Sequence, residues 1–182
     1  MQRGTALVLS FAAAALATFT LWQSPLFSKT PRGSDAGTTV AEVNHAAVWD
    51  AQLPDLAGQT QALKQWQGKV VVLNFWAPWC PPCRKEIPGF IRQQDSLGVQ
   101  GLQIVGVALD EAEKVQAYAD ETGINYPILL GEMQAVALGQ AAGNRLGGLP
   151  YTAIFNRQGQ VVATLVGELD EARLITLVKP LL

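Results

Sequence analysis

The feature that most constrains the fold is an apolar run that leads directly into a pair of cysteines. Residues 69–76 read KVVVLNFW, and a run this rich in β-branched and aromatic side chains predicts a strand buried on both faces. Such a strand belongs in a sheet with helices on both sides, which indicates an α/β fold. Cys80 and Cys83, the two cysteines of the chain, follow in the sequence WCPPC, where a helix is expected to begin.

The order of the remaining segments predicts a mixed central sheet covered by helices. The pattern first predicts a hairpin within 49–63, the strand at 69–76, a helix after Cys80 that ends at Gly98, and a strand at 103–108. A helix follows that is opened by a capping box of Asp110 and Glu113 and ends at Gly123, and after it come a strand at 127–130 and a helix at 132–142. The chain closes with a hairpin of 152–155 and 160–165 and a last helix capped by Asp170. Alternation of this kind places helices on both faces of the sheet.

The N-terminal segment has a different character from the rest of the chain. Residues 5–22 carry no charge and follow Arg3, a length that suits a secretory signal or a short membrane span. No small-x-small cleavage site follows, so an uncleaved signal anchor is favoured over a cleaved signal peptide for residues 1–23. Residues 24–39, rich in Ser, Thr, Pro and Gly, predict a flexible tether before a folded domain at 40–182. That domain is expected outside the cytoplasm, where disulfides persist.

Two cysteines three positions apart at a helix start are suited to thiol–disulfide exchange. The N–H groups and partial positive charge of a helix N-terminus stabilise a thiolate, so Cys80 is expected to be a low-pKa nucleophile. Cys83 lies on the same helical face one turn later, close enough to resolve a mixed disulfide. Pro81 and Pro82 fit the first helical turn but remove two N–H donors, so this spacer leaves the reduction potential open.

Other uses of two thiols fit the sequence less well. A structural zinc site needs four ligands, and beyond the thiols the chain offers only His45, in the tether region. Haem attachment needs CxxCH, but Arg84 follows Cys83, and a loop this short makes a poor structural staple. Copper(I) binding by two thiolates stays open as a rival, although no bound metal or cofactor is expected. A net charge of −2 without a basic patch argues against a nucleic-acid partner.

The sequence resembles the thioredoxin superfamily, and within it the membrane-tethered TlpA/ResA/DsbE group of periplasmic thiol–disulfide oxidoreductases. The resemblance covers residues 48–182 and is carried by GKVVVLNFWAPWCPPCRKEIP at 68–88 and by GGLPYT at 147–152. It implies a thioredoxin fold with an N-terminal β extension and an inserted strand–helix element within 111–145.

The resemblance also implies roles for side chains around the cysteines. Cys80 is the attacking thiol and Cys83 the resolving thiol in such proteins. Pro150 matches the family's cis-proline beside the active site, where the Leu149 backbone would pair with a client segment. Trp79 matches the family's tryptophan and would line the docking surface.

One departure from thioredoxin shifts the expected proton transfer to a different residue. Asn74 stands where thioredoxin has a buried aspartate, six residues before the first cysteine. An amide cannot carry the proton, so this task is assigned to Glu86, three residues after Cys83 and at an acidic position typical of the group. The alternative for Glu86 is a favourable charge near a helix start.

These observations predict a membrane-anchored periplasmic thiol–disulfide oxidoreductase, acting as a monomer. It is expected to reduce disulfides of client proteins, of the cytochrome c maturation or metal-site assembly type, with electrons from a thiol donor in the membrane. A disulfide oxidase or isomerase on the same fold and a copper(I)-binding metallochaperone are the alternatives.

Overall fold

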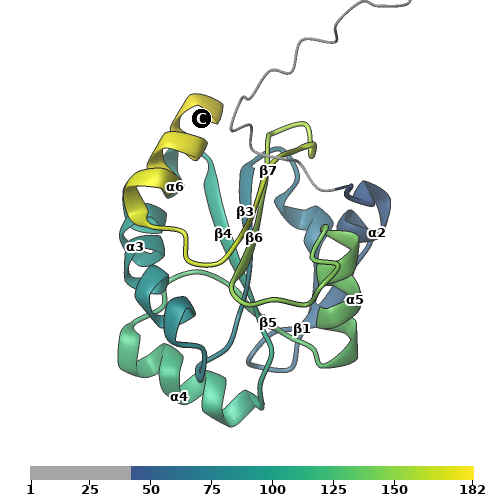
Figure 1. Cartoon of the computed structure of the whole chain (residues 1–182), viewed down its shortest axis with the longest axis vertical. Helices are drawn as coiled ribbons and strands as arrows, with labels where there is room; N and C mark the ends of the chain where they lie inside the picture. Colours follow the sequence, from purple (N-terminus) through teal and green to yellow (C-terminus); the bar gives the residue numbers. More distant parts are fainter. Residues whose placement is uncertain (1–41) are drawn as a thin grey trace, which may run out of the picture. The chain divides into compact units, whose positions relative to one another are not determined.

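The computed structural model describes residues 42–182, in which five strands form one mixed sheet (Figure 1). In spatial order these are β5 (Ile128–Leu130), β4 (Leu102–Ala108), β3 (Val70–Trp76), β6 (Tyr151–Phe155) and β7 (Val161–Val166). β3 pairs in parallel with β4 and antiparallel with β6, so the sheet is mixed as predicted. Every residue of β3 is buried, as the apolar run at 69–76 predicts.

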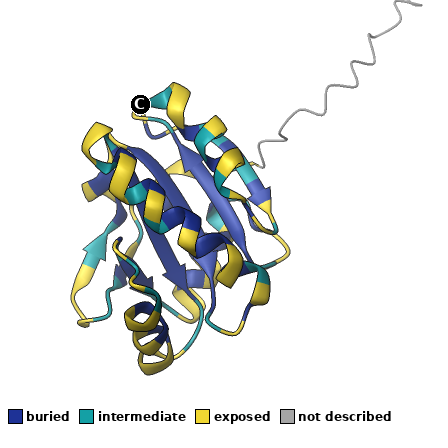
Figure 2. Cartoon of the chain, turned by 90° about the vertical axis from the view of Figure 1, so that its left-hand side faces the viewer, coloured by how far each residue is buried: buried dark blue, intermediate teal, exposed yellow. Residues whose placement is uncertain are grey.

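Helices cover both faces of this sheet: α3, α4 and α6 lie on one face, and α2 and α5 on the other (Figure 1). On the first face Phe90 of α3 packs in one apolar cluster with Val72, and on the second Trp49 of α2 packs with Leu73. Figure 2 shows the buried strands between helices whose outer sides are exposed. The helices are α2 (His45–Trp49), α3 (Pro81–Leu97), α4 (Ala112–Thr122), α5 (Met133–Ala141) and α6 (Glu171–Val178), with 3-10 turns η3 (Leu63–Trp66), η4 (Gly98–Gln100) and η5 (Lys179–Leu181).

Two additions extend this core. β1 (Gln52–Pro54) and β2 (Thr60–Ala62) pair antiparallel and form the expected N-terminal β extension. A bridge between Asp55 and Leu129 ties their turn to β5. Between β4 and β6 the chain forms α4, β5 and α5, in the stretch where the resemblance places the inserted strand–helix element.

One predicted helix end is confirmed and another is wrong. Gly98 is the C-cap of α3, as predicted, but its φ of −57° is helical rather than left-handed, and a 3-10 turn follows that ends at Gly101 with φ 104°. The capping box of Asp110 and Glu113 is wrong, because Glu111 is the N-cap of α4 and makes no side-chain cap bond. Asp110 instead accepts a bond from the N–H of Glu111. Both ends depend on the backbone path, which a local pattern of residue types does not fix.

Other predicted ends are confirmed. Gly123 ends α4 with a left-handed φ of 70°, and Asp170 caps α6 by accepting a bond from the Arg173 N–H. The predicted anchor at 1–23 and tether at 24–39 lie outside the described residues, as do the first two positions of the domain predicted at 40–182. Across 42–182, no helix combines the length and apolar character needed to cross a membrane.

Candidate active site

A disulfide joins Cys80 and Cys83 at the junction between β3 and α3. Cys80 is the N-cap of α3, and its Sγ accepts a hydrogen bond from the Cys83 N–H at 3.4 Å. Their Cα atoms are 5.3 Å apart. Cys80 is 3% exposed and Cys83 is fully buried, so Cys80 is the one nearer to solvent. The strand end and helix start therefore lie where the sequence predicts them.

The first turn of α3 offers few backbone donors to the sulfur atoms. Pro81 and Pro82 occupy its first two positions, and proline has no N–H. The Cys83 N–H is thus the first backbone donor of the helix, and it points at Cys80 Sγ. A helix N-terminus normally presents several free N–H groups, so this one stabilises a thiolate less than its position suggests.

Glu86 lies buried one turn beyond Cys83 on the same helix. Its Oε1 accepts a hydrogen bond from Asn74 Nδ2 at 2.7 Å, and its Oε2 accepts one from the Leu169 N–H at 2.9 Å. Burial, with a smaller contribution from the nearby charge of Glu168, raises the pKa of Glu86 to about 7. The two hydrogen bonds lower this pKa but do not outweigh the effect of burial. A carboxyl group with this pKa can give or take a proton at neutral pH.

Asn74 links the carboxyl group of Glu86 to the sheet. The Nδ2 atom of Asn74 also donates to Thr152 Oγ1 at 3.0 Å, across the β3–β6 pairing. Its Oδ1 has no hydrogen-bond partner among the residues that the structure describes. The side-chain amide of Asn74 is therefore only partly hydrogen-bonded. The sequence analysis did not identify Thr152 or Leu169; a threonine inside an otherwise apolar strand was the available signal for the former.

The loop before β6 packs beside the disulfide. The Leu149–Pro150 peptide is cis, as expected, and Leu149 packs against the apolar cluster that contains both cysteines. Two hydrogen bonds between Asn144 and Gly148 hold the loop: Asn144 Nδ2 donates to the carbonyl of Gly148 at 2.9 Å, and Asn144 Oδ1 accepts from its N–H at 3.1 Å. The carbonyl of Pro150 accepts from the Gly167 N–H at 2.8 Å. The buried Asn144 is a further site residue that the sequence analysis missed.

Around the disulfide the surface combines one exposed aromatic ring with charged side chains that have partners. Trp79 is 63% exposed, directly before Cys80, whereas Trp76 is buried in the core. Arg84 lies over the Tyr118 ring, 5.2 Å from its centroid, and Lys85 pairs with Glu168 at 3.8 Å. Trp79 is the large apolar side chain here that is free to meet another protein.

His45 does not belong to the tether region, which corrects the sequence analysis. It begins α2, its Nδ1 lies 3.1 Å from the carbonyl oxygen of Gly159, and its ring contacts Phe155 on the face of the sheet opposite the cysteines. Within residues 42–182, no three His, Cys, Asp or Glu side chains are grouped in a way that could hold a metal ion.

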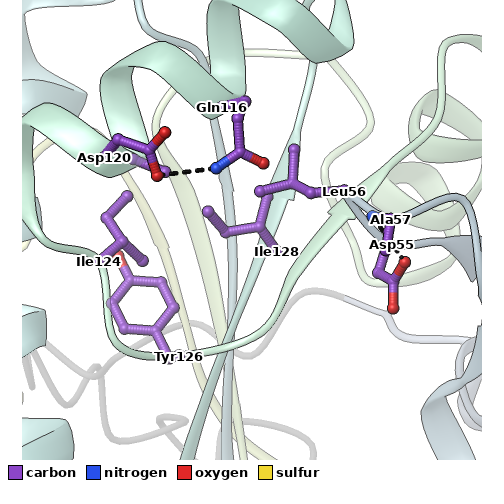
Figure 3. A pocket seen from close by; sticks show the side chains of 9 residues that line it. Asp55, Leu56, Ala57, Gln116, Asp120, Ile124, Tyr126 and Ile128 are labelled. Carbon is purple, nitrogen blue, oxygen red and sulfur yellow. Dashed lines mark hydrogen bonds between the residues drawn. The ribbon is translucent and has the colours of Figure 1, made fainter.

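A separate cavity of about 310 Å³ lies between α4 and the β1–β2 turn (Figure 3). Its two carboxylates already have partners: Asp55 accepts a hydrogen bond from Gln61, and Asp120 accepts one from Gln116. Neither cysteine lines it, nor does any residue of the loop before β6. This cavity is therefore distinct from the candidate active site.

A disulfide at the start of the helix that follows the central strand, with a cis-proline loop packed against it, defines the class: a thiol–disulfide oxidoreductase of thioredoxin fold. The chain belongs to the AhpC/TSA family, which residues 43–164 match.

The relatives agree with this assignment. The thiol-disulfide oxidoreductase ResA of Halalkalibacterium halodurans is 34% identical over 132 residues, covering 70% of this chain and 73% of the relative. The protein of the same name from Bacillus subtilis is 33% identical over 132 residues, covering 70% and 72%. A crystal structure of a thiol:disulfide interchange protein of the thioredoxin family from Chlorobium tepidum matches with a TM-score of 0.65 at 26% identity, covering 81% of this chain and 99% of that one.

Proposed function

We propose that this oxidoreductase works as a reductant of client protein disulfides in the periplasm, through Cys80 and Cys83. The observation that carries the direction is the weak support for a thiolate at the N-terminus of α3. Pro81 and Pro82 supply no N–H, and Glu86 is a buried carboxyl group one turn behind Cys83. A dithiol whose thiolate is poorly stabilised gives up its electrons readily, whereas a strong oxidant stabilises its reduced form.

The reaction follows from the order of the two thiols along the helix. The Cys80 thiolate attacks one sulfur of a client disulfide, which breaks the client S–S bond, forms a mixed disulfide and releases a client thiolate. Glu86 in its carboxylate form then takes the proton of the Cys83 thiol, and the Cys83 thiolate attacks Cys80 Sγ. The second client thiolate leaves, the Cys80–Cys83 disulfide forms, and the client has gained two electrons. A thiol donor in the membrane restores the dithiol.

Docking is proposed to use the surface on either side of Cys80. Trp79 offers an exposed ring, and the backbone of Leu149 next to Pro150 offers an edge to which an extended client segment can add as a strand. Clients of the cytochrome c maturation or metal-site assembly type are those that the family resemblance favours. The chain is proposed to act as a monomer, held to the membrane by residues 1–23 and positioned by the tether at 24–39.

The reduction potential of the Cys80–Cys83 pair tests the direction. Equilibration with thiol buffers of known potential should give a value close to that of thioredoxin, about −270 mV, and a value near −120 mV would instead make the protein an oxidant. Cys83→Ser should accumulate mixed disulfides with reducible clients, and Cys80→Ser should form none. Tight copper(I) binding without measurable disulfide exchange would favour the metallochaperone alternative.

A further inference from the structure

An apolar groove leads from the active-site loop to the N-terminus of α5. A small cavity lined by Leu149 and a larger one of about 390 Å³ lined by Met133 share two side chains, Leu109 and Val136. The two cavities therefore adjoin one another at these side chains, and together they are called the groove below. At its inner end, Leu149 packs both against the apolar cluster that contains the cysteines and against the cluster on the α5 side of the sheet.

The outer half of the groove exposes apolar side chains. Met133 is 77% exposed and Val136 is 37% exposed. Exposed apolar side chains that gather in a depression, beside a site that must meet other proteins, are typical of a docking surface. The flexible, polarisable side chain of methionine adapts to different apolar partners.

The rim of the groove is acidic. Asp110, Glu111 and Glu132 line the larger cavity. Among residues 42–182, Lys114 supplies the one ammonium group paired with them, 3.5 Å from Asp110 and 3.1 Å from Glu111. Three carboxylates against one ammonium group leave a local negative charge, which favours positively charged partners and disfavours negatively charged ones.

We propose that this groove binds an extended client segment that carries an apolar residue and, next to it, a lysine or arginine near the target cysteine. The apolar side chain would lie between Met133 and Val136, the cation would face Glu111 and Glu132, and the client disulfide would reach Cys80. The oxidoreductase would then prefer disulfides with basic flanks. This inference rests on the proposed function, because it names the client class of the same site.

The test uses two synthetic peptides that each contain one disulfide and an adjacent leucine, and that differ only in having lysine or glutamate as the flanking residues. The reduced wild-type protein is expected to show a kcat/KM for the lysine peptide at least about fivefold above that for the glutamate peptide at low salt, and the ratio should shrink towards one in about 1 M salt. Glu111→Lys combined with Glu132→Lys should reverse the preference. Glu121→Lys, an exposed charge change of the same kind on α4, should leave it unchanged.

Two further measurements separate this inference from the proposed function. Met133→Ser, at an exposed position where folding is not at risk, should lower kcat/KM for both peptides by a similar factor. Reduction of hydroxyethyl disulfide, which is too small to use the groove, should proceed at the same rate in every variant. Equal wild-type rates for the two peptides, or no effect of Met133→Ser, would overturn the groove proposal. The proposed function would still stand in that case if the protein reduced hydroxyethyl disulfide. Failure to reduce any of the three would refute the proposed function itself.

Discussion

The ionisation of Glu86 is coupled to folding, because its carboxyl group is buried and receives only two strong hydrogen bonds. Burial raises its pKa from an ordinary 4.5 to about 7. The folded protein therefore binds a proton between these values that the unfolded chain has released, so the stabilising effect is complete below pH 4.5 and is lost as the pH rises through 7. At roughly 1.4 kcal/mol per pKa unit, the difference is about 3 kcal/mol.

The oxidised protein should accordingly lose up to about 3 kcal/mol of unfolding free energy between pH 5 and pH 8. Glu86→Gln should flatten this dependence, because the amide does not titrate. Urea unfolding at the two pH values measures it. Glu171→Gln is the matched control: hydrogen bonds from Arg92 lower the pKa of Glu171, so its linkage lies below pH 4.5 and the slope from pH 5 to pH 8 should remain. A slope that survives in Glu86→Gln would assign the titration to another group.

Trp79 is the second single residue with a distinct expected effect. Its ring is 63% exposed directly before Cys80, and tryptophan is enriched among residues that dominate protein interfaces. Trp79→Ala should lower kcat/KM for the reduction of insulin about tenfold, as expected for a loss of roughly 1.4 kcal/mol, and leave the reduction of hydroxyethyl disulfide unchanged. Val99→Ala, which also truncates an exposed apolar side chain, is the control. Equal losses on both substrates would show damage to the thiols rather than to docking.

Among the elements, those that bury a continuous apolar face were the most predictable. The strand β3 could be predicted because a strand buried along its whole length requires an unbroken apolar run. The last hairpin could be predicted because its turn needs a glycine, Gly159, at a φ of 75°. The helix start at Asp110 was mispredicted, because Glu111 is the N-cap instead and capping depends on where the chain turns next. Within the site, the cysteines, Glu86 and the cis peptide could be read from motifs.

The partners of Glu86 could not be found in this way, because they come from distant parts of the chain. Thr152 lies 78 positions from Asn74, and Leu169 lies 83 positions from Glu86. Folding alone brings them together: β6 pairs Thr152 directly opposite Asn74, and the segment before α6 places the Leu169 N–H against the carboxylate. No local spacing of residue types encodes such a meeting.

The helix that carries both thiols gives a prediction at the scale of the element. Pro82→Ala restores an N–H at the second position of α3, where a cap side chain normally finds a donor. A donor to a charged group contributes about 1.5 kcal/mol, so the pKa of the Cys80 thiol should fall by roughly one unit. At a pH above this pKa, where the reduced protein carries the thiolate, the reduction potential should rise by about 30 mV. Thiol titration by alkylation rate and equilibration with thiol buffers measure the two effects.

The control lies in the same helix. Pro88→Ala restores an N–H in the interior of α3, at an exposed position beyond the first turn, and should leave both the thiol pKa and the potential unchanged. If Pro82→Ala also left them unchanged, the weak thiolate support inferred for the first turn would be wrong, and the low potential that we propose for this pair would need another cause.

At the scale of the whole molecule, the open question is whether the N-terminal segment holds the catalytic domain at the membrane. The site residues lie within 42–182, whereas the uncharged run of 18 residues from Thr5 to Trp22 precedes them. A charged residue at the centre of a membrane-spanning helix costs about 2.5–3.5 kcal/mol by insertion measurements. If this run is the anchor that we propose, two charges placed within it should abolish anchoring and leave the chemistry of the thiols unchanged.

The full chain, expressed in a bacterium with a periplasm, is expected to stay in the membrane fraction through an alkaline carbonate wash. Ala14→Arg combined with Ala17→Arg should release it or prevent its export, while the purified variant reduces hydroxyethyl disulfide at the wild-type rate, because its domain is unchanged. Mass spectrometry of the wild-type N-terminus separates the two processing alternatives: an intact Met1 end supports the anchor. A soluble periplasmic form that begins beyond Trp22 would show that residues 1–23 are a cleaved signal, and that the client reaches a free rather than a tethered oxidoreductase.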